Sequence, residues 1–193
     1  MNPEIDEIFE EELPQEEEKG VETSPAGLDR GRVRRMIYLR RAGEWSPLLF
    51  ILPFVILFIL TAFPRFSVPW ELEWMEGQSA VQAWRFSEGL PLYPEASENW
   101  VPYIYTPLYH MVVGTLMEVT GDWSLAWGRL ISLMSSLVTV LAILAMVYDR
   151  TRRLAPAVIA GLLYFAFYKP TGFWFDIVRV DAFAFALTAW GMF

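Results

Sequence analysis

Apolar residues in this chain are gathered in long blocks rather than at short intervals. Residues 46–63, SPLLFILPFVILFILTAF, and residues 123–148, WSLAWGRLISLMSSLVTVLAILAMVY, are nearly continuous apolar runs. Crossing the hydrocarbon core of a bilayer takes about 20 apolar residues in a helix. Each run is therefore predicted to be a membrane-spanning helix, and Pro53 is a kink that a span tolerates.

Two shorter apolar runs follow the second predicted span. Residues 154–168, LAPAVIAGLLYFAFY, are predicted to form a third span. Residues 181–193, DAFAFALTAWGMF, begin a fourth that is shorter than a span requires and lacks a polar flank. We expect from this that the chain is the N-terminal part of a longer protein, with a naturally short C-terminus as the alternative. The predicted fold class is all-α, a polytopic membrane helical bundle.

The connection between the first two spans, residues 64–122, is long enough to have structure of its own. Within it, residues 76–89 are predicted to form a helix that ends at Gly89. Residues 106–121 are short for a span and contain Glu118. Their apolar residues fall at the i, i+3, i+4 spacing of one helix face, so we predict a juxtamembrane helix on the membrane surface. That face consists of Leu108, Met111, Val112, Thr115, Leu116 and Val119.

Charge is segregated along the chain. Residues 1–29 are rich in Glu and poor in large apolar side chains, and are predicted to be a disordered acidic tail. Residues 30–45 form a basic segment that includes RGRVRRMIYLRR, and only Arg65 lies close after the first span. Because Lys and Arg favour the cytoplasmic side of a membrane, the N-terminus and this basic segment are predicted to be cytoplasmic.

The same bias orients the later spans. If residues 106–121 lie on the membrane rather than across it, the basic stretch DRTRR at 149–153 is cytoplasmic as well. Residues 64–122 and 169–181 then share the extracytoplasmic side. The predicted location is a multi-pass protein of the plasma (inner) membrane.

Composition excludes several kinds of site. The chain of 193 residues is 54% hydrophobic, has no cysteine and contains one histidine, His110. Disulfide frameworks, thiolate nucleophiles, cysteine-ligated zinc and histidine-rich metal sites are therefore excluded. A divalent metal ion held by carboxylates stays open. No nucleic-acid partner is expected.

The sequence WELEWMEG, residues 70–77, places three glutamates just after the first span. Glu71 is expected to be an ordinary solvated charge. Glu76 lies at the start of a predicted helix beside apolar neighbours, a setting typical of functional carboxylates. Glu73 lies three residues earlier and shares a face with Glu76 if both are helical.

A second cluster of ionisable residues precedes the last apolar run. The sequence FDIVRVD contains Asp176, Arg179 and Asp181, and Lys169 lies in the same loop. A helix cap at Asp181 and an ion pair between Asp176 and Arg179 are the structural alternatives. Ionisable groups at the edge of a span nevertheless indicate a functional site. Arginine binds phosphate in a bidentate way and lysine acts as a point charge, so these cations could hold a lipid-borne phosphate.

The order of these features resembles that of the GT-C superfamily of integral-membrane glycosyltransferases. First comes a span, followed by an acid-bearing helix that ends in the motif G-x-x-x-Y. Next come the sequence PYIYTPLY and a surface helix. Two further motifs, G-D-W-S-x-x-x-x-R-L-I-S and then D-x-x-R-V-D, each begin a span. The resemblance covers about residues 46–193. It is closest to the bacterial branch that contains the protein mannosyltransferases and the lipid A aminoarabinose transferases.

The resemblance implies an inverting transfer of a sugar from a polyprenyl-phosphate donor to a lipid, glycan or protein acceptor. It also implies a catalytic acid in the first extracytoplasmic loop, where the family usually has Asp-Glu and this chain has Met75-Glu76. Either Glu76 or Glu73 would then be the base, and Asp181 matches the second acid of the family.

Further residues take roles under the same resemblance. Arg179 and Lys169 would stabilise the leaving phosphate, a role for which Arg85 is a weaker candidate. Asp176, Tyr105 and His110 complete the candidate substrate-binding set.

A non-enzymatic polytopic protein, such as a transporter segment or an assembly factor, is the alternative. Transporters place ionisable residues near the middle of the bilayer, whereas here they gather at its edge.

The predicted topology can be tested by cysteine labelling, because the chain has no cysteine of its own. A Ser97→Cys variant should react with a membrane-impermeant thiol reagent added to the extracytoplasmic side of intact cells. Labelling only after the cytoplasmic face has been made accessible would contradict the topology.

Overall fold

The computed structural model describes residues 30–98 and 101–193. The predicted disordered tail, residues 1–29, lies outside the described residues. The chain divides into two units, Met1–Leu39 and Arg40–Phe193. In the first unit the described backbone is the beginning of helix α2 (Arg30–Trp45), a segment that the sequence marked as basic but did not predict to be helical.

The second unit is built from helices. After the end of α2 come α3 (Leu48–Phe66), α4 (Trp74–Ser87), α5 (Pro107–Thr120), α6 (Leu125–Thr151), α7 (Leu154–Leu163), the short 3₁₀ helix η1 (Tyr164–Phe167) and α8 (Val180–Met192). Residues 30–98 and 101–193 contain no β-strand. The all-α prediction is confirmed for this part of the chain.

Two helical stretches are long and apolar enough to cross a membrane by length and composition: Arg35–Phe66 and Leu125–Thr151. They correspond to the first two predicted spans, 46–63 and 123–148, although the second stretch begins two residues later than predicted. The other two predicted spans correspond to shorter apolar helices, Leu154–Phe167 and Val180–Met192. The structure therefore supplies two candidate spans, and the four-span topology stays a prediction.

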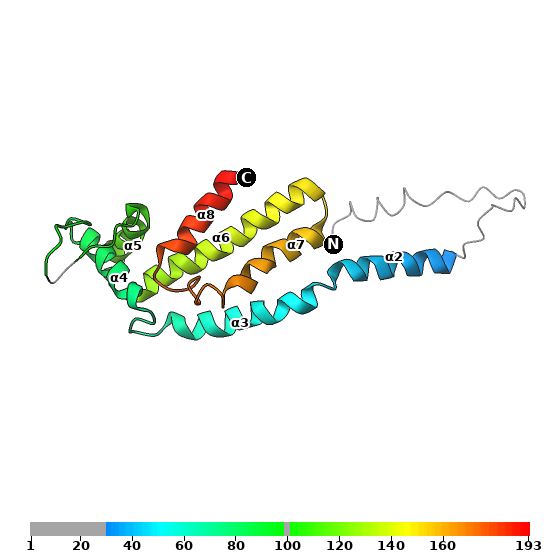
Figure 1. Cartoon of the computed structure of the whole chain (residues 1–193), viewed down its shortest axis with the longest axis horizontal. Coiled ribbons are helices and arrows are strands. Elements are labelled where there is room, and N and C mark those ends of the chain that lie inside the picture. Colours follow the sequence, from blue (N-terminus) through cyan, green and yellow to red (C-terminus); the bar gives the residue numbers. More distant parts are fainter. Residues whose placement is uncertain (1–29, 99–100) are drawn as a thin grey trace, which may run out of the picture. The chain divides into compact units, whose positions relative to one another are not determined.

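Helix α6 is the central element of the second unit. It packs against α7 and α8 along its length and also contacts α3, α4 and α5. Figure 1 shows α4 and α5 beside the N-terminal end of α6, while α3 and α7 run alongside it. The segments that carry the candidate acids are thus gathered at one end of the bundle.

Two apolar clusters hold these helices together. The first joins α3 to η1 and the loop that follows it, and consists of Phe58, Ala62, Phe165, Tyr168 and Phe175. The second joins α4 and α5 to the same loop, and consists of Ala83, Tyr109, Val113, Met117 and Val178. The loop between η1 and α8 therefore belongs to both clusters.

This loop, residues 168–179, is also fixed to α6 by close approach and by hydrogen bonds. A Cβ atom at Gly128 would lie 2.5 Å from a methyl carbon of Val178, so only glycine lets α6 and the loop come this close. Ser136 donates a hydrogen bond of 2.8 Å to the carbonyl oxygen of Phe175, and Ser132 donates one of 3.2 Å to that of Arg179. The residues just before α8 are held against α6 as a result.

Helix α4 begins two residues earlier than predicted because Glu73 is its N-cap. The Glu73 side chain accepts a hydrogen bond of 3.1 Å from the backbone N–H of Met75, and its own backbone is extended (φ −151°, ψ 141°). Gly89, with φ +68°, follows the helix as predicted. Glu73 lies just outside the helix, so the condition under which it would share a helix face with Glu76 is not met.

Helix α5 matches the predicted range 106–121, with Pro107 at its first position and Gly121 at φ +66° after its end. The face that packs inside the protein carries Tyr109, His110, Val113, Gly114 and Met117. In the predicted apolar stripe, Leu108, Met111 and Val119 are exposed. That stripe is available for contact with a membrane surface, although the placement of α5 relative to a membrane stays a prediction.

Candidate functional site

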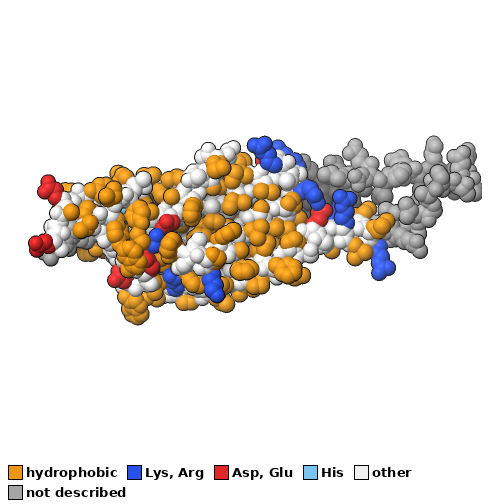
Figure 2. All heavy atoms as spheres, in the orientation of Figure 1, with side chains coloured by type: hydrophobic (Ala, Val, Ile, Leu, Met, Phe, Trp, Pro, Cys, Tyr) orange, Lys and Arg blue, Asp and Glu red, His pale blue; other side chains and the backbone are white. Residues whose placement is uncertain are grey.

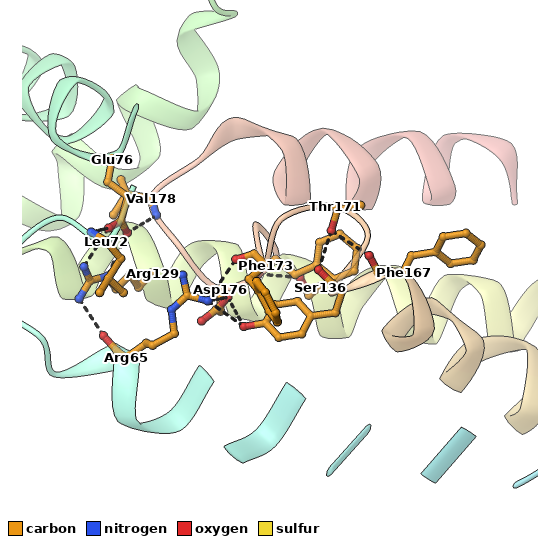
Figure 3. Close-up of polar contacts among 12 residues, drawn as sticks. Arg65, Leu72, Glu76, Arg129, Ser136, Phe167, Thr171, Phe173, Asp176 and Val178 are labelled. Atoms are coloured by element: carbon orange, nitrogen blue, oxygen red, sulfur yellow. Dashed lines mark hydrogen bonds and ion pairs between the residues drawn. The ribbon is translucent and has the colours of Figure 1, made fainter. Parts of the chain in front are cut away.

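A fully buried ion pair joins Glu76 of α4 to Arg129 of α6. Arg129 donates from Nε to Glu76 Oε1 at 3.0 Å and from Nη2 to Oε2 at 3.0 Å, a bidentate contact. Both side chains have 0% relative exposure. Figure 3 shows the two groups meeting between the helices.

Backbone groups occupy the remaining acceptor positions of Glu76. The N–H of Val178 donates to Oε1 at 2.8 Å, and the N–H of Leu72 donates to Oε2 at 2.7 Å. A carboxylate has about four lone-pair positions. With four donors in place and no exposure, Glu76 has no position left for a substrate proton.

Arg129 is equally saturated. Beyond Glu76 it donates to three backbone carbonyl oxygens, those of Arg65 at 2.8 Å, Val68 at 2.5 Å and Trp70 at 2.9 Å. These contacts use the five N–H groups of a guanidinium. The pair therefore binds α4, α6, the end of α3, the segment after α3 and the loop before α8 to one another.

Glu73 has a more open environment. Its side chain is 19% exposed, and its Oε2 accepts a hydrogen bond from Arg179 Nη1 at 3.3 Å. The same oxygen accepts the capping hydrogen bond from Met75. Glu73 thus combines partial access to solvent with a fixed position and unused acceptor capacity.

Arg179 brings Glu73 and Asp181 together. Its Nε donates to Asp181 Oδ2 at 2.8 Å, and its guanidinium carbon lies 3.8 Å from the ring centroid of Trp174. Arg179 is 6% exposed, whereas Asp181 is 31% exposed. Two carboxylates that are far apart in the sequence, Glu73 and Asp181, therefore flank one arginine that stacks on an indole ring.

Aromatic side chains lie next to Glu73. Tyr103 packs edge-on against Trp74 at 6.0 Å and against Tyr105 at 5.8 Å between ring centroids. Burial, and to a lesser extent the negative charge of Glu73, raise the pKa of Tyr103 above its ordinary value. Gln82 of α4 holds this segment by donating to the carbonyl oxygen of Tyr103 at 2.9 Å.

Asp176 belongs to a different network from Arg179, so the i, i+3 ion pair considered from the sequence does not form. Its Oδ1 accepts hydrogen bonds from Tyr168 Oη at 2.7 Å and from Arg65 Nη1 at 3.2 Å. Its Oδ2 is buried without a hydrogen-bond partner among the described residues. Burial raises the pKa of Asp176, and Arg65 and Tyr168 oppose that shift.

Three other predicted site residues make no hydrogen bond or ion pair with Glu73, Arg179 or Asp181 among the residues that the structure describes. His110 is fully buried against α4, and burial lowers its pKa to about 4. Arg85 donates from Nε to the carbonyl oxygen of Pro91 at 2.9 Å and so holds the turn after α4. Lys169 is exposed and makes no ion pair with any candidate residue in the described part of the chain.

The structure also shows three site residues that were not assigned a role in the site from the sequence. Arg129 occurs in the motif that carries the family resemblance, and a charged residue inside an apolar run is itself a functional signal. Arg65 was considered only as a flanking charge. Trp174 had no signal in the sequence, because its position under Arg179 depends on the fold of the loop.

No three His, Asp or Glu side chains within residues 30–98 and 101–193 are grouped closely enough to hold a metal ion. Comparison with models of protein families, with curated proteins and with solved structures gives no match. The site must therefore be interpreted from its own geometry.

Replacing Glu76 by glutamine should destabilise the fold, because Arg129 would remain buried without a countercharge. Breaking a buried ion pair from one side typically costs about 3–5 kcal/mol. Chemical unfolding of the purified protein in detergent micelles measures this change. Glu118→Gln, at an exposed glutamate of α5, is the matched control and should leave stability unchanged. Equal stability of the two variants would contradict the structural role of Glu76.

The buried His110 should make the fold less stable in acid. The pKa of His110 is lowered to about 4 in the folded protein from 6.5 in a free chain, so between these values the unfolded state binds the extra proton. The free energy of unfolding should fall as the pH is lowered through this window, by up to about 1.4 kcal/mol per pH unit.

The comparison that isolates this effect is His110→Gln, measured over the same pH range in the same detergent. Asp176, whose pKa is raised, acts in the opposite direction, but it is present in both proteins. The variant should lose less stability than the parent protein between about pH 6 and pH 4. Parallel profiles would show that His110 is not the responsible group.

Proposed function

We propose that this protein is a membrane glycosyltransferase, which transfers a sugar from a polyprenyl-phosphate donor to an acceptor on the extracytoplasmic side with inversion at the anomeric carbon. The observation that carries the proposal is the cluster of Glu73, Arg179 and Asp181. It joins two partly exposed carboxylates to a cation in a setting lined by aromatic rings. The resemblance of the sequence to the GT-C superfamily points to the same chemistry.

The surface of α3 supports a membrane location. Phe50, Leu49 and Phe63 are 78%, 72% and 84% exposed on this helix. Exposed apolar surface of this extent would be unfavourable in water and is covered at no cost by lipid. Figure 2 shows hydrophobic side chains over most of the visible face of the helical bundle, with most charged side chains toward its ends.

Glu73 has the properties required of the base. It would accept the proton of the acceptor hydroxyl group while the oxygen of that group attacks the anomeric carbon. The new bond forms between the acceptor oxygen and this carbon, and the bond from the carbon to the phosphate oxygen breaks. The electron pair leaves with the polyprenyl phosphate. Of the two glutamates that the sequence left open, Glu73 alone has free acceptor capacity.

Arg179 would stabilise the negative charge that develops on the leaving phosphate. Its guanidinium already contacts two carboxylates, so the phosphate must compete with them. The contact with Glu73 is the longer of the two, 3.3 Å against 2.8 Å with Asp181. Donor binding would displace this contact first, which would release Glu73 for the proton transfer, while Asp181 keeps Arg179 in place.

Glu73→Gln should abolish transfer without unfolding the protein. Glutamine keeps the oxygen that caps α4 but cannot take up the proton, and loss of a general base typically lowers the rate about 10²–10⁴-fold. Transfer is measured in vesicles with radiolabelled polyprenyl-phosphate sugars, and donor affinity separately with unglycosylated polyprenyl phosphate. Affinity for the latter should not fall in this variant.

Two further variants separate the roles. Arg179→Ala should weaken polyprenyl-phosphate binding as well as transfer, because its partner is present in both ground and transition states. Glu71→Gln, at an exposed neighbouring glutamate, is the matched control and should retain transfer. Full activity of Glu73→Gln would refute the assignment of the base. Absence of both transfer and polyprenyl-phosphate binding in the parent protein would favour the non-enzymatic alternative, a transporter segment or an assembly factor.

A further inference from the structure

The first ten residues of α2 are basic in sequence and contain no acidic residue. Residues 30–39 contain four arginines and no acid, and the next acidic residue along the helix is Glu44. The first turn of α2 contains no acidic residue. An isolated helix of this composition would be destabilised in two ways.

The first is repulsion between like charges four residues apart, as at positions 30 and 34. The second is the position of these charges at the N-terminal end of a helix, where the helix dipole disfavours cations. Both effects disappear when anions surround the segment. The helical state of residues 30–39 therefore favours an anionic environment supplied from outside the helix.

Apolar side chains of the same segment indicate what kind of environment this is. Met36, Ile37, Tyr38 and Leu39 are 55%, 48%, 72% and 63% exposed. Successive residues of a helix point about 100° apart, so these four cover the whole circumference. By the same 100° rule, helix positions 30 and 34 fall on a different side from positions 32 and 35, so the arginine positions are not confined to one face. A helix whose basic and apolar positions are spread around its circumference fits the headgroup layer of a membrane better than a protein or nucleic-acid surface on one side.

The chain itself keeps this segment close to the membrane. Leu39 and the start of α3 at Leu48 are nine residues apart, a distance of at most about 30 Å even when fully extended. If α3 spans the membrane, Leu39 stays within that distance of the membrane surface, and the rest of the segment is tethered there through it. This step rests on the proposed membrane location and is independent of glycosyl transfer.

We propose that residues 30–39 bind the phosphate headgroups of acidic phospholipids at the cytoplasmic surface of the membrane. Arginine suits this role because its planar guanidinium forms bidentate contacts with phosphate. Clusters of basic residues next to a membrane span attract anionic lipids with an energy that increases with each Lys or Arg. The exposed apolar side chains would contact the acyl-chain boundary below the phosphates.

The experiment uses the full chain, which has no cysteine, with a fluorophore attached through Tyr38→Cys. The protein is reconstituted into vesicles of phosphatidylcholine and phosphatidylglycerol. Two samples are compared: in one the phosphatidylcholine carries bromine, and in the other the phosphatidylglycerol carries it, at the same mole fraction of brominated lipid. Bromine quenches nearby fluorescence, so the ratio of quenching by the two lipids reports which one gathers at residue 38. The ratio should favour phosphatidylglycerol, and should fall toward one at about 1 M salt, where the screening length is about 3 Å.

Charge variants and a second labelling position provide the controls. The fourfold variant R30Q/R32Q/R34Q/R35Q should bring the ratio to one, whereas R30K/R32K/R34K/R35K, which keeps the charge, should retain a preference. A fluorophore attached through Ser97→Cys should report no preference.

Three outcomes would overturn the proposal. The first is a ratio of one in the parent protein, and the second is an unchanged ratio in the glutamine variant. The third is a nucleic acid that binds the segment and is not displaced by phosphatidylglycerol vesicles. In the first case, deletion of residues 1–29 identifies the competing anion. If the deletion raises the ratio above one, the tail with its eleven acidic residues, and not lipid, binds residues 30–39 in the full chain.

Discussion

The carboxylate of Glu76 and the guanidinium of Arg129 meet where five segments of the chain converge. Removing two charges from solvent is costly, and their attraction offsets that cost only if the remaining donors and acceptors are also satisfied. Here the five N–H groups of Arg129 and the four acceptor positions of Glu76 all have partners. The arrangement of α4, α6 and the loop before α8 depends on this condition, since any change of register would leave a charge or a carbonyl oxygen unpaired.

The more exposed cluster depends on the buried pair. Val178, whose N–H binds Glu76, directly precedes Arg179, and Leu72, whose N–H binds the same carboxylate, directly precedes Glu73. The two partners of the contact between Glu73 and Arg179 are thus each one residue away from an anchor on Glu76. The two glutamates differ in their environments: the buried one has every acceptor position filled and fixes the backbone, whereas the partly exposed one keeps unused acceptor capacity.

Arg65 connects this centre to Asp176. Its carbonyl oxygen accepts from Arg129, and its side chain donates to Asp176 Oδ1 and to the carbonyl oxygen of Phe173. The end of α3 is thereby tied to the loop between η1 and α8 at Phe173 and Asp176, as Figure 3 shows. An otherwise apolar helix thus carries, in its last turn, an arginine that contacts both networks.

The sequence by itself determined the helices after α2 and most of their limits. Apolar runs and i, i+3, i+4 spacing are local properties, and Pro107, Gly89 and Gly121 mark helix ends through their own backbone preferences. The sequence also identified the two acid-bearing segments and brought Arg179 and Asp181 into one candidate site. It could not choose between Glu73 and Glu76, because that choice depends on which carboxylate faces Arg129.

Only the tertiary structure decided the partners. Glu76 and Arg129 are 53 residues apart in the chain, and Arg65 and Asp176 are 111 apart, so no local pattern relates them. The side chain of Glu73 turns toward Arg179 because its backbone is extended at the N-cap, whereas Glu76, one helical turn later, points into the bundle. A three-residue spacing predicts a shared face only inside a helix, and the helix begins between these two residues.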